Sequence, residues 1–426
     1  MSYQLSTLEN GLKVLTVEMP NRDSAAVAVW VKTGGRYEKK KFSGVSHFLE
    51  HMMFKGTKTR SIRQIKEEIE GVGGILNAFT GEEVTCYFAK LLKQHYTRAL
   101  TVLSDMVLNA TVPADELVKE RTVILEEIKM YRDLPSHHVH DLMGELLWPD
   151  QPLGRTLAGT PETVSRMTRS DILGYKKDSY HPANILVSIA GNIEHDEVLR
   201  QAAEIYKTPL KRKPSVFTPA ESVQKRPRTH FFEKKTEQTH FVIGLHALPR
   251  THPDRYKLGL LHVMLGANMS SRLFEEVREK RGLAYEIKSS VAAYQDTGAF
   301  TVSAGVETSK SVKALAVILK ELGKVRKSFV KEGELRRAKD YFMSQVYLGV
   351  EDTLDYMLWA GEKALCAGEL PDKEEIRQKV EAVTLEDVRS IAQELFRTRS
   401  LNLSLIGPVP EKMQRELTKQ LEIEGS

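Results

Sequence analysis

Two short stretches with nearly the same pattern, far apart in the chain, restrict the possible folds most strongly. Residues 185–191 read ILVSIAG and residues 401–407 read LNLSLIG, so each is an apolar run that ends in glycine. Such a run is typical of a buried β-strand. The segments before the two runs also resemble each other in plan. We therefore expect an α+β fold with two similar domains, each a mixed β-sheet covered by helices, related by internal duplication.

The apolar periodicity of the chain predicts the main elements of both halves. Strands are expected at residues 3–8, 12–18, 25–32, 75–80, 84–91, 184–190, 231–235, 240–247, 287–293, 299–306 and 401–406. Helices are expected at residues 44–54, 61–70, 96–108, 115–132, 255–265 and 271–280. Ser43, Ser61 and Asp115 stand where the first turns of three of these helices need a capping side chain, and Gln64 completes a capping box with Ser61.

The chain is too long for a single ordinary core, since it has 426 residues. Near residue 209 its character changes, and the segment LKRKPSVFTPAESVQKRPR has three prolines and a surplus of Lys and Arg. This composition is typical of a solvated linker. The expected organisation is a zinc-binding catalytic domain at residues 1–208, a linker at 209–228 and a second, homologous domain at 229–426.

The bulk composition argues against several classes of protein. A formal net charge of +5 is small for this length, and no motif for binding nucleic acid is present. No apolar run approaches the length of a membrane span. Two cysteines, Cys86 and Cys366, favour a reducing compartment. The first residues do not have the pattern of a signal peptide or presequence. We expect a cytoplasmic protein without nucleic-acid or membrane partners.

The stretch GVSHFLEHMMF at residues 44–54 carries the clearest chemistry. His47 and His51 are four residues apart, so on a helix their imidazoles lie on one face and can converge on one Zn²⁺. Glu50 shares that face and could take a proton from the attacking water. This H-x-x-E-H pattern arises by chance in roughly a few per cent of chains of this length. Two protein ligands are also too few for a catalytic zinc site, which normally has three.

A second helix offers candidates for the third ligand. Residues 115–132 contain four glutamates, Glu116, Glu120, Glu126 and Glu127. Glu120 and Glu127 are two turns apart and share a stripe. A solvated acidic face is the alternative for any one of them alone. Apolar neighbours of that stripe, Val123, Ile124 and Ile128, favour a partly buried carboxylate, which needs a partner such as a metal.

H-x-x-E-H, followed further along the chain by the glutamate pair of VILEEIKMY, resembles the pitrilysin (insulinase) family of zinc metallopeptidases, the inverzincins. The nearest members are the mitochondrial processing peptidase β-subunit and its small bacterial relatives. The resemblance covers essentially the whole chain. It implies that His47, His51 and Glu127 bind one Zn²⁺ per chain and that Glu50 is the general base. It also implies that Glu120 supports the metal site by contacting a ligand rather than the metal itself.

The resemblance further implies residues that hold a peptide substrate. Asn77 and Ala78 would lie in an edge strand to which an extended peptide adds through main-chain hydrogen bonds. Phe54 would line the pocket for the residue after the scissile bond. Sequence alone leaves alternatives open. For Asn77, a turn residue after the glycine-rich segment is an equally good interpretation. For Phe54, an ordinary core residue of an amphipathic helix is at least as good an interpretation.

The second half contributes the segment REKRGLAY, residues 278–285. By the same resemblance, Tyr285 would hydrogen-bond the developing oxyanion and act as a catalytic residue, and Arg278 would grip the substrate backbone. Arg281 is a rival of Arg278 for that contact. Two surface residues beside a helix end are the alternative interpretation.

One departure from the family concerns cleavage specificity. Processing peptidases carry two acidic residues that favour an arginine before the cleavage site. The corresponding residues here are His137 and Asp141, so a strict preference for arginine is in doubt. His137, His138 and His140 are expected to lie in a polar loop, because Pro135 should break the preceding helix.

These observations favour a zinc-dependent endopeptidase that hydrolyses short or unfolded peptides. Family members enclose their substrate between two bowl-shaped halves of two domains each, so this chain would complete a chamber as a homodimer. A non-catalytic core or scaffold subunit of a peptidase-like complex is the alternative. A catalytic chain that works only beside an inactive sister chain is a third possibility, which the presence of Arg278 and Tyr285 disfavours.

Overall fold

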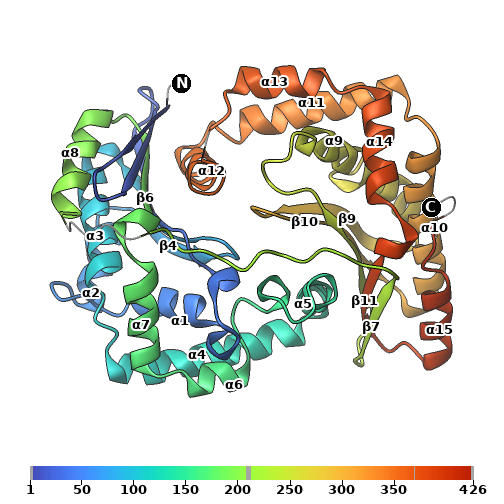
Figure 1. Cartoon of the computed structure of the whole chain (residues 1–426), viewed down its shortest axis with the longest axis horizontal. Helices are drawn as coiled ribbons and strands as arrows, with labels where there is room; N and C mark the ends of the chain where they lie inside the picture. Colours follow the sequence, from blue (N-terminus) through green and yellow to red (C-terminus); the bar gives the residue numbers. More distant parts are fainter. Residues whose placement is uncertain (1–2, 208–212, 369, 424–426) are drawn as a thin grey trace. The chain divides into compact units, whose positions relative to one another are not determined.

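The computed structural model describes residues 3–207, 213–368 and 370–423, and they divide into two compact units (Figure 1). The first unit takes its described residues from Met1–Ile128, Arg155–Thr218 and Leu348–Leu370. The second takes them from Lys129–Gly154, Pro219–Tyr347 and Pro371–Ser426. The units are therefore discontinuous in sequence. The domain boundaries expected from the duplication stay a prediction: 1–208, 209–228 and 229–426. Residues 208–212, at the start of the expected linker, lie outside the described residues.

The first unit is built on a six-stranded sheet with the order β1-β2-β6-β3-β5-β4. Its strands are β1 (Tyr3–Thr7), β2 (Lys13–Glu18), β3 (Ser24–Val31), β4 (Ile75–Thr80), β5 (Thr85–Leu92) and β6 (Ile185–Gly191). β2 and β6 run parallel, and the other neighbours run antiparallel. β4 pairs only with β5, so its other edge carries no strand among the described residues.

Helices cover both faces of this sheet. Apolar side chains from one face pack in a core with seven of the helices. These are α1 (Val45–Met53), α2 (Ile62–Glu70), α3 (Tyr96–Asn109), α4 (Ala114–Asp133), α6 (Pro161–Arg166), α7 (Arg169–Ser179) and α8 (His195–Ile205). The other face packs against α12 (Thr353–Cys366), a helix from the far end of the sequence. There Gly361 faces the buried ring of Trp30, whose Nε1 donates to Ser188 Oγ.

The second unit has a five-stranded sheet with the order β7-β11-β8-β10-β9. Its strands are β7 (Arg228–Glu233), β8 (Thr239–Ala247), β9 (Ala284–Ala293), β10 (Gly298–Val306) and β11 (Asn402–Gly407), of which β7 and β11 run parallel. Its helices are α5 (Pro135–Leu147), α9 (Arg255–Gly266), α10 (Ser311–Lys327), α11 (Glu332–Leu348), α13 (Lys373–Glu381), α14 (Leu385–Leu395) and α15 (Glu411–Lys419). α5 contacts β8 and β11 and packs there in an apolar cluster.

The two sheets repeat one topology, which confirms the predicted α+β fold with two similar domains. From β2 and β7 onward, the strands correspond in the order β2-β6-β3-β5-β4 and β7-β11-β8-β10-β9. The third helix after the central hairpin of each half, α5 or α12, belongs to the unit built mainly from the other half. No pattern in the sequence predicted this exchange.

Local chain signals account for most element bounds, with three corrections. The capping box of Ser61 and Gln64 is present. The predicted cap Ser43 is wrong, because the residue at the N-cap of α1 is Gly44. Asp115 lies inside the first turn of α4 rather than before it. The predicted polar loop of histidines is also wrong: Pro135 occupies the first turn of α5, where its missing N–H costs nothing.

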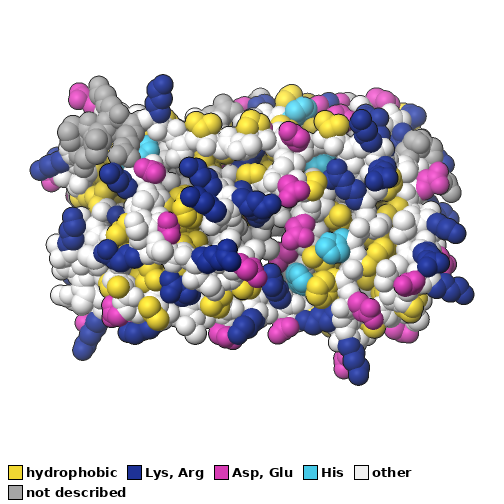
Figure 2. All heavy atoms as spheres, turned by 60° about the horizontal axis from the view of Figure 1, so that its bottom comes forward, with side chains coloured by type: hydrophobic (Ala, Val, Ile, Leu, Met, Phe, Trp, Pro, Cys, Tyr) yellow, Lys and Arg dark blue, Asp and Glu magenta, His cyan; other side chains and the backbone are white. Residues whose placement is uncertain are grey.

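On the face drawn in Figure 2, Lys and Arg side chains are spread with Asp and Glu side chains between them. Within the described part of the chain, none of the helices combines the length and the apolar character that a membrane crossing needs.

Candidate metal centre

The H-x-x-E-H segment forms α1, and its apolar residues fix which way the helix faces. Phe48, Leu49 and Met52 are fully buried in the core of the first unit. His47 and His51 are only partly buried and lie one turn apart, with ring centroids 4.6 Å from each other. The burial of the apolar stripe therefore leaves both imidazoles on the less buried side of the same helix.

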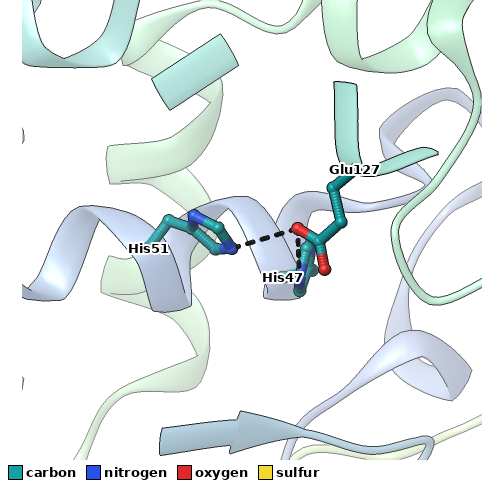
Figure 3. Close-up of side chains that lie close together, drawn as sticks. All are labelled: His47, His51 and Glu127. Carbon is teal, nitrogen blue, oxygen red and sulfur yellow. Dashed lines mark ion pairs between the residues drawn. The ribbon is translucent and has the colours of Figure 1, made fainter. Parts of the chain in front are cut away.

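Glu127 of α4 brings a carboxylate to these two imidazoles (Figure 3). Its Oε2 lies 3.7 Å from Nε2 of His47 and 3.6 Å from Nε2 of His51. The three side chains are the one group of potential metal ligands found among the described residues, with ligand atoms all within 4.8 Å of one another. Ligand atoms about 2.0–2.1 Å from a tetrahedral zinc lie roughly 3.4 Å apart. The set of two nitrogens and one oxygen therefore fits Zn²⁺ and leaves a fourth position open.

Glu120, two turns before Glu127 on the same stripe of α4, holds one of the rings. Its Oε2 lies 3.0 Å from Nδ1 of His51, and its Oε1 lies 2.5 Å from Nζ of Lys55. Burial raises the pKa of Glu120, but the hydrogen bonds from Lys55 and His51 outweigh this effect and leave the pKa below its ordinary value. An ionised Glu120 keeps the proton of His51 on Nδ1, so that Nε2 presents its lone pair to a metal.

His47 has a different environment. Burial, together with the charge of a protonated His51, lowers the pKa of His47 to about 4. The neutral ring that results is the form that can bind a metal. Nδ1 of His47 is buried and has no hydrogen-bond partner among the described residues, so Glu120 orients only one of the two rings.

The side chain of Glu50 extends from α1 to β4 of the sheet. Its Oε2 accepts a hydrogen bond from Oγ1 of Thr80, the last residue of β4. Burial raises the pKa of Glu50 above its ordinary value, and the hydrogen bond from Thr80 partly offsets that rise. A carboxylate with a raised pKa is better suited to accept and return a proton near neutral pH.

A buried carboxylate also fixes the start of α1. Oε2 of Glu38 accepts from the backbone N–H of Gly44 at 2.7 Å, and Oε1 accepts from that of Ser46 at 2.8 Å. These N–H groups belong to the first turn, where a helix has no internal acceptors. Glu38 is 5 % exposed, and burial raises its pKa to about 7. The contact fixes α1 in place immediately before His47.

The predicted substrate residues of the first unit lie on β4 and at the end of α1. Ala78 packs against the core on the same side as α1, while Asn77 is exposed. Oδ1 of Asn77 accepts from the backbone N–H of Ala78 at 2.8 Å. Phe54 caps the end of α1 and packs against the core, with its ring 6.4 Å from that of Tyr87. Substrate contacts of all three stay predictions.

Arg278 and Tyr285 belong to the second unit, so their role at the metal centre also stays a prediction. Arg278 lies in a π-helical turn (Phe274–Glu279) with its guanidinium over the rings of Phe274 and Tyr285. Tyr285 is the second residue of β9 and lies largely in solvent, at 75 % exposure. The guanidinium of the rival Arg281 is bound by the backbone and carboxylate of Glu276.

The two residues at the family's specificity positions also lie in the second unit, on α5. Burial, followed by the charge of Glu145, raises the pKa of Asp141 to about 6. His137 and Asp141 thus stand one turn apart on a helix, where only Asp141 can supply a negative charge.

Three residues around the centre were not predicted from the sequence: Lys55, Thr80 and Glu38. Lys55 lies two residues beyond the end of α1 and its partner Glu120 is on α4, so no local spacing indicates this contact. Thr80 stands two residues after Ala78, so the period of a strand places both on one face. No signal in the sequence connects Glu38 with a helix that begins several residues later.

Comparison with known proteins gives consistent matches for both halves. Residues 13–161 match the family model described as "Insulinase (Peptidase family M16)", and residues 166–342 match that of the "Peptidase M16 inactive domain". An "uncharacterized zinc protease" of Streptomyces coelicolor is 36% identical over 97% of this chain and 91% of its own length. The "uncharacterized zinc protease YmxG" of Bacillus subtilis is also 36% identical, over 94% of this chain and 97% of its own length.

Solved structures agree on the fold. A structure described as a protease from Helicobacter pylori has a TM-score of 0.89 at 23% identity, and the match covers 96% of this chain and 99% of that one. A "peptidase M16 inactive domain" from Pseudomonas fluorescens also has a TM-score of 0.89, at 19% identity over 96% of this chain and 98% of that one.

Proposed function

Because the chain belongs to the M16 (insulinase) family of peptidases, which includes relatives named zinc proteases, we propose that it is a zinc-dependent endopeptidase of short or unfolded peptides. The observation that carries this proposal is the convergence of His47, His51 and Glu127, with Glu50 on the same helix as the two histidines. The residues lie in the part of the chain that matches the insulinase model, at residues 13–161.

The proposed reaction is the hydrolysis of a peptide bond. Zinc held by His47, His51 and Glu127, one ion per chain, would polarise the scissile carbonyl and acidify the attacking water. Glu50 takes a proton from that water as the water attacks the carbonyl carbon. Glu50 then gives this proton to the departing amine as the C–N bond breaks, and so returns to its carboxylate form.

Other residues would hold and orient the substrate. We assign the edge of β4 around Asn77 and Ala78 to the peptide backbone and Phe54 to the side chain after the scissile bond. Tyr285 would donate to the oxyanion and Arg278 would bind the substrate backbone. The binding of Arg281 to Glu276 supports Arg278 as the residue that is left to contact a substrate.

The assembly and location are part of the proposal. A homodimer in which each chain completes a chamber around the peptide would exclude folded proteins and favour short or unfolded ones. The chain has only two cysteines, Cys86 and Cys366, and both are buried, which supports a reducing, cytoplasmic location. No role for nucleic acid or membrane is proposed.

A scaffold without catalysis is the second candidate, and the match of residues 166–342 to the inactive-domain model is compatible with it. That match begins at residue 166, however, and the potential metal ligands His47, His51 and Glu127 all lie before it. The retained set of two histidines and two glutamates favours the catalytic candidate.

The deciding experiment is mass spectrometry of an unstructured peptide of about 20 residues, a length chosen to fit a small-substrate chamber. The peptide is incubated with the purified zinc-loaded chain and with Glu50→Gln, after both are shown to contain equal zinc. Cleavage by the parent alone is expected. No cleavage by either protein, with several peptides, would favour the scaffold. Equal cleavage by both would contradict the role of Glu50.

A further inference from the structure

The hydroxyl of Thr80 is the one hydrogen-bond donor to Glu50 among the residues that the structure describes. It reaches Oε2 of Glu50 from β4, while Glu50 itself lies on α1. The two residues are thirty positions apart in the sequence. The base is therefore fixed from the sheet and not from its own helix, and the donor comes from the edge strand.

The chemistry of the two side chains makes this contact directional. A glutamate has three rotatable bonds and loses considerable freedom when it is held in one position. Threonine is branched at Cβ and stiff at χ1, so its hydroxyl stays where the strand places it. On β4, Thr80 lies two residues after Ala78, whose side chain packs against the core beside α1. The strand that presents the donor is thus held against the helix that presents the base.

We propose that Thr80 is a positioning residue for the general base, whose hydroxyl holds Oε2 of Glu50 and leaves Oε1 to exchange a proton with the attacking water. The consequence for catalysis rests on the proposed peptidase function. Thr80 keeps its own proton throughout. The proton that Oε1 takes from water is the one that later passes to the amine, so the hydroxyl changes the orientation of Glu50 and not the stoichiometry.

The kinetic test compares Thr80→Val with Thr80→Ser, each zinc-loaded. Valine keeps the shape of the side chain but has no donor, and a hydrogen bond to a charged group corresponds to about a 10- to 100-fold change in rate. We expect kcat for peptide cleavage to fall by that factor, while KM and zinc content stay within about twofold of the parent. Thr80→Ser should recover kcat to within about threefold.

The matched control is Thr85→Val. Thr85 is the partner of Thr80 in the β4–β5 ladder, but its hydroxyl donates to the backbone oxygen of Thr33. This variant should lower the thermal midpoint and leave kcat unchanged. A kcat of Thr80→Val equal to that of the parent, or a loss in Thr85→Val as large as in Thr80→Val, would overturn the proposal.

A second readout does not depend on activity. Crystal structures of the zinc-loaded parent and of Thr80→Val should differ in the side-chain torsions of Glu50, with the carboxylate turned or disordered in the variant. An unchanged Glu50 would overturn the proposal. If the parent cleaves no peptide but Glu50 moves, the peptidase function fails and the positioning role stands. If Thr80→Val does not fold, Thr80→Ala takes its place under the same criteria.

Discussion

At the residue scale, the carboxylate of Glu120 shows how the centre is held. It touches His51 on one side and Lys55 on the other, at 3.0 Å and 2.5 Å. A carboxylate that is largely buried needs such partners, and here they keep it ionised. The charge of Glu120 then favours the tautomer of His51 in which Nε2 is free to bind a metal.

Replacing Glu120 should therefore weaken metal binding without removing a ligand. We expect Glu120→Gln to lower the zinc affinity about 10- to 100-fold, the range for partners of ligating histidines. Competition with a chromogenic chelator measures this affinity. Glu116→Gln, on the same helix and paired with Lys119, is the control and should bind zinc as the parent does. Equal affinities of all three proteins would show that Glu120 has no supporting role.

The sequence predicted a part of the centre and missed the rest for a physical reason. The convergence of His47 and His51 follows from four-residue spacing on one helix. Glu127 required the resemblance to a family, because any of four glutamates could have been a solvated residue. Thr80 and Glu38 come from other elements, and only the packing of those elements against α1 brings them to it. The roles of Asn77, Phe54, Arg278 and Tyr285 stay predictions.

At the scale of an element, the first turn of α1 depends on a carboxylate with an unusual pKa. Glu38 binds two backbone N–H groups, yet burial raises its pKa from 4.5 to about 7. The charged neighbours of Glu38 are Arg155 and the partly buried Glu82, whose pKa is also raised. A raised carboxyl pKa means that the folded state retains a proton that the unfolded state has lost.

The pH dependence of stability follows from that sign. The contribution of Glu38 is complete below about pH 4.5 and is lost as the pH rises to about 7. Relative to Glu38→Gln, which cannot titrate, the parent should lose about 3 kcal/mol of unfolding free energy over this range. Urea midpoints of both proteins at pH 5 to 8, with EDTA to remove zinc, test this. A difference that stays constant or grows with pH would contradict it.

The packing of α12 gives a second prediction for an element. A Cβ on Gly361 would lie 2.4 Å from Nε1 of Trp30, whose ring is buried. Gly361→Ala should therefore destabilise the chain by about 1–3 kcal/mol, the usual cost of overpacking. Gly174→Ala on α7 is the control, because its Cβ would meet nothing within 4 Å. That variant should gain about 1 kcal/mol from helix propensity. Denaturant unfolding measures the unfolding free energy of both variants. Equal changes in the two would contradict the close packing of Gly361 against Trp30.

Strands were easier to predict than helices in this chain. Apolar runs that end in glycine, such as β6 and β11, identify buried strands with little ambiguity. Four helices of the first half, α5 to α8, were missed. α5 begins at a proline that also reads as the end of α4, and α6 and α7 are short or weakly amphipathic.

At the scale of the molecule, the exchange of α5 and α12 makes each half depend on the other. The face of the first sheet around Trp30 is covered by α12, and the second sheet packs on α5. A fragment of residues 1–228 lacks α12, and a fragment of residues 229–426 lacks α5. Each would expose an apolar face in water.

Separate expression should show this dependence. We expect each fragment alone to be insoluble and the two fragments, expressed together, to give a soluble complex that binds zinc. Size-exclusion chromatography and zinc analysis of the co-expressed pair measure the outcome. A fragment that is soluble, monomeric and cooperatively folded by itself would contradict the prediction.

The duplication was visible in the sequence, but the exchange was not. Repeated strand patterns are local and survive divergence. Whether a helix packs on the nearer or the farther sheet depends on long-range contacts, and the amphipathic patterns of α5 and α12 fit either. Predictions from periodicity therefore gave the strands of each domain and not the unit to which a helix belongs.

The reciprocal position of these two helices also bears on ancestry. α5 and α12 are counterparts in the repeated topology, and each lies on the sheet of the opposite repeat. Two copies of a half-length ancestor that exchanged this helix would have formed a domain-swapped dimer. Fusion of its genes through a connecting segment would give the present arrangement directly. After the fusion, one repeat could lose its metal-binding histidines. Neither repeat could be deleted, because each supplies a helix that covers the sheet of the other.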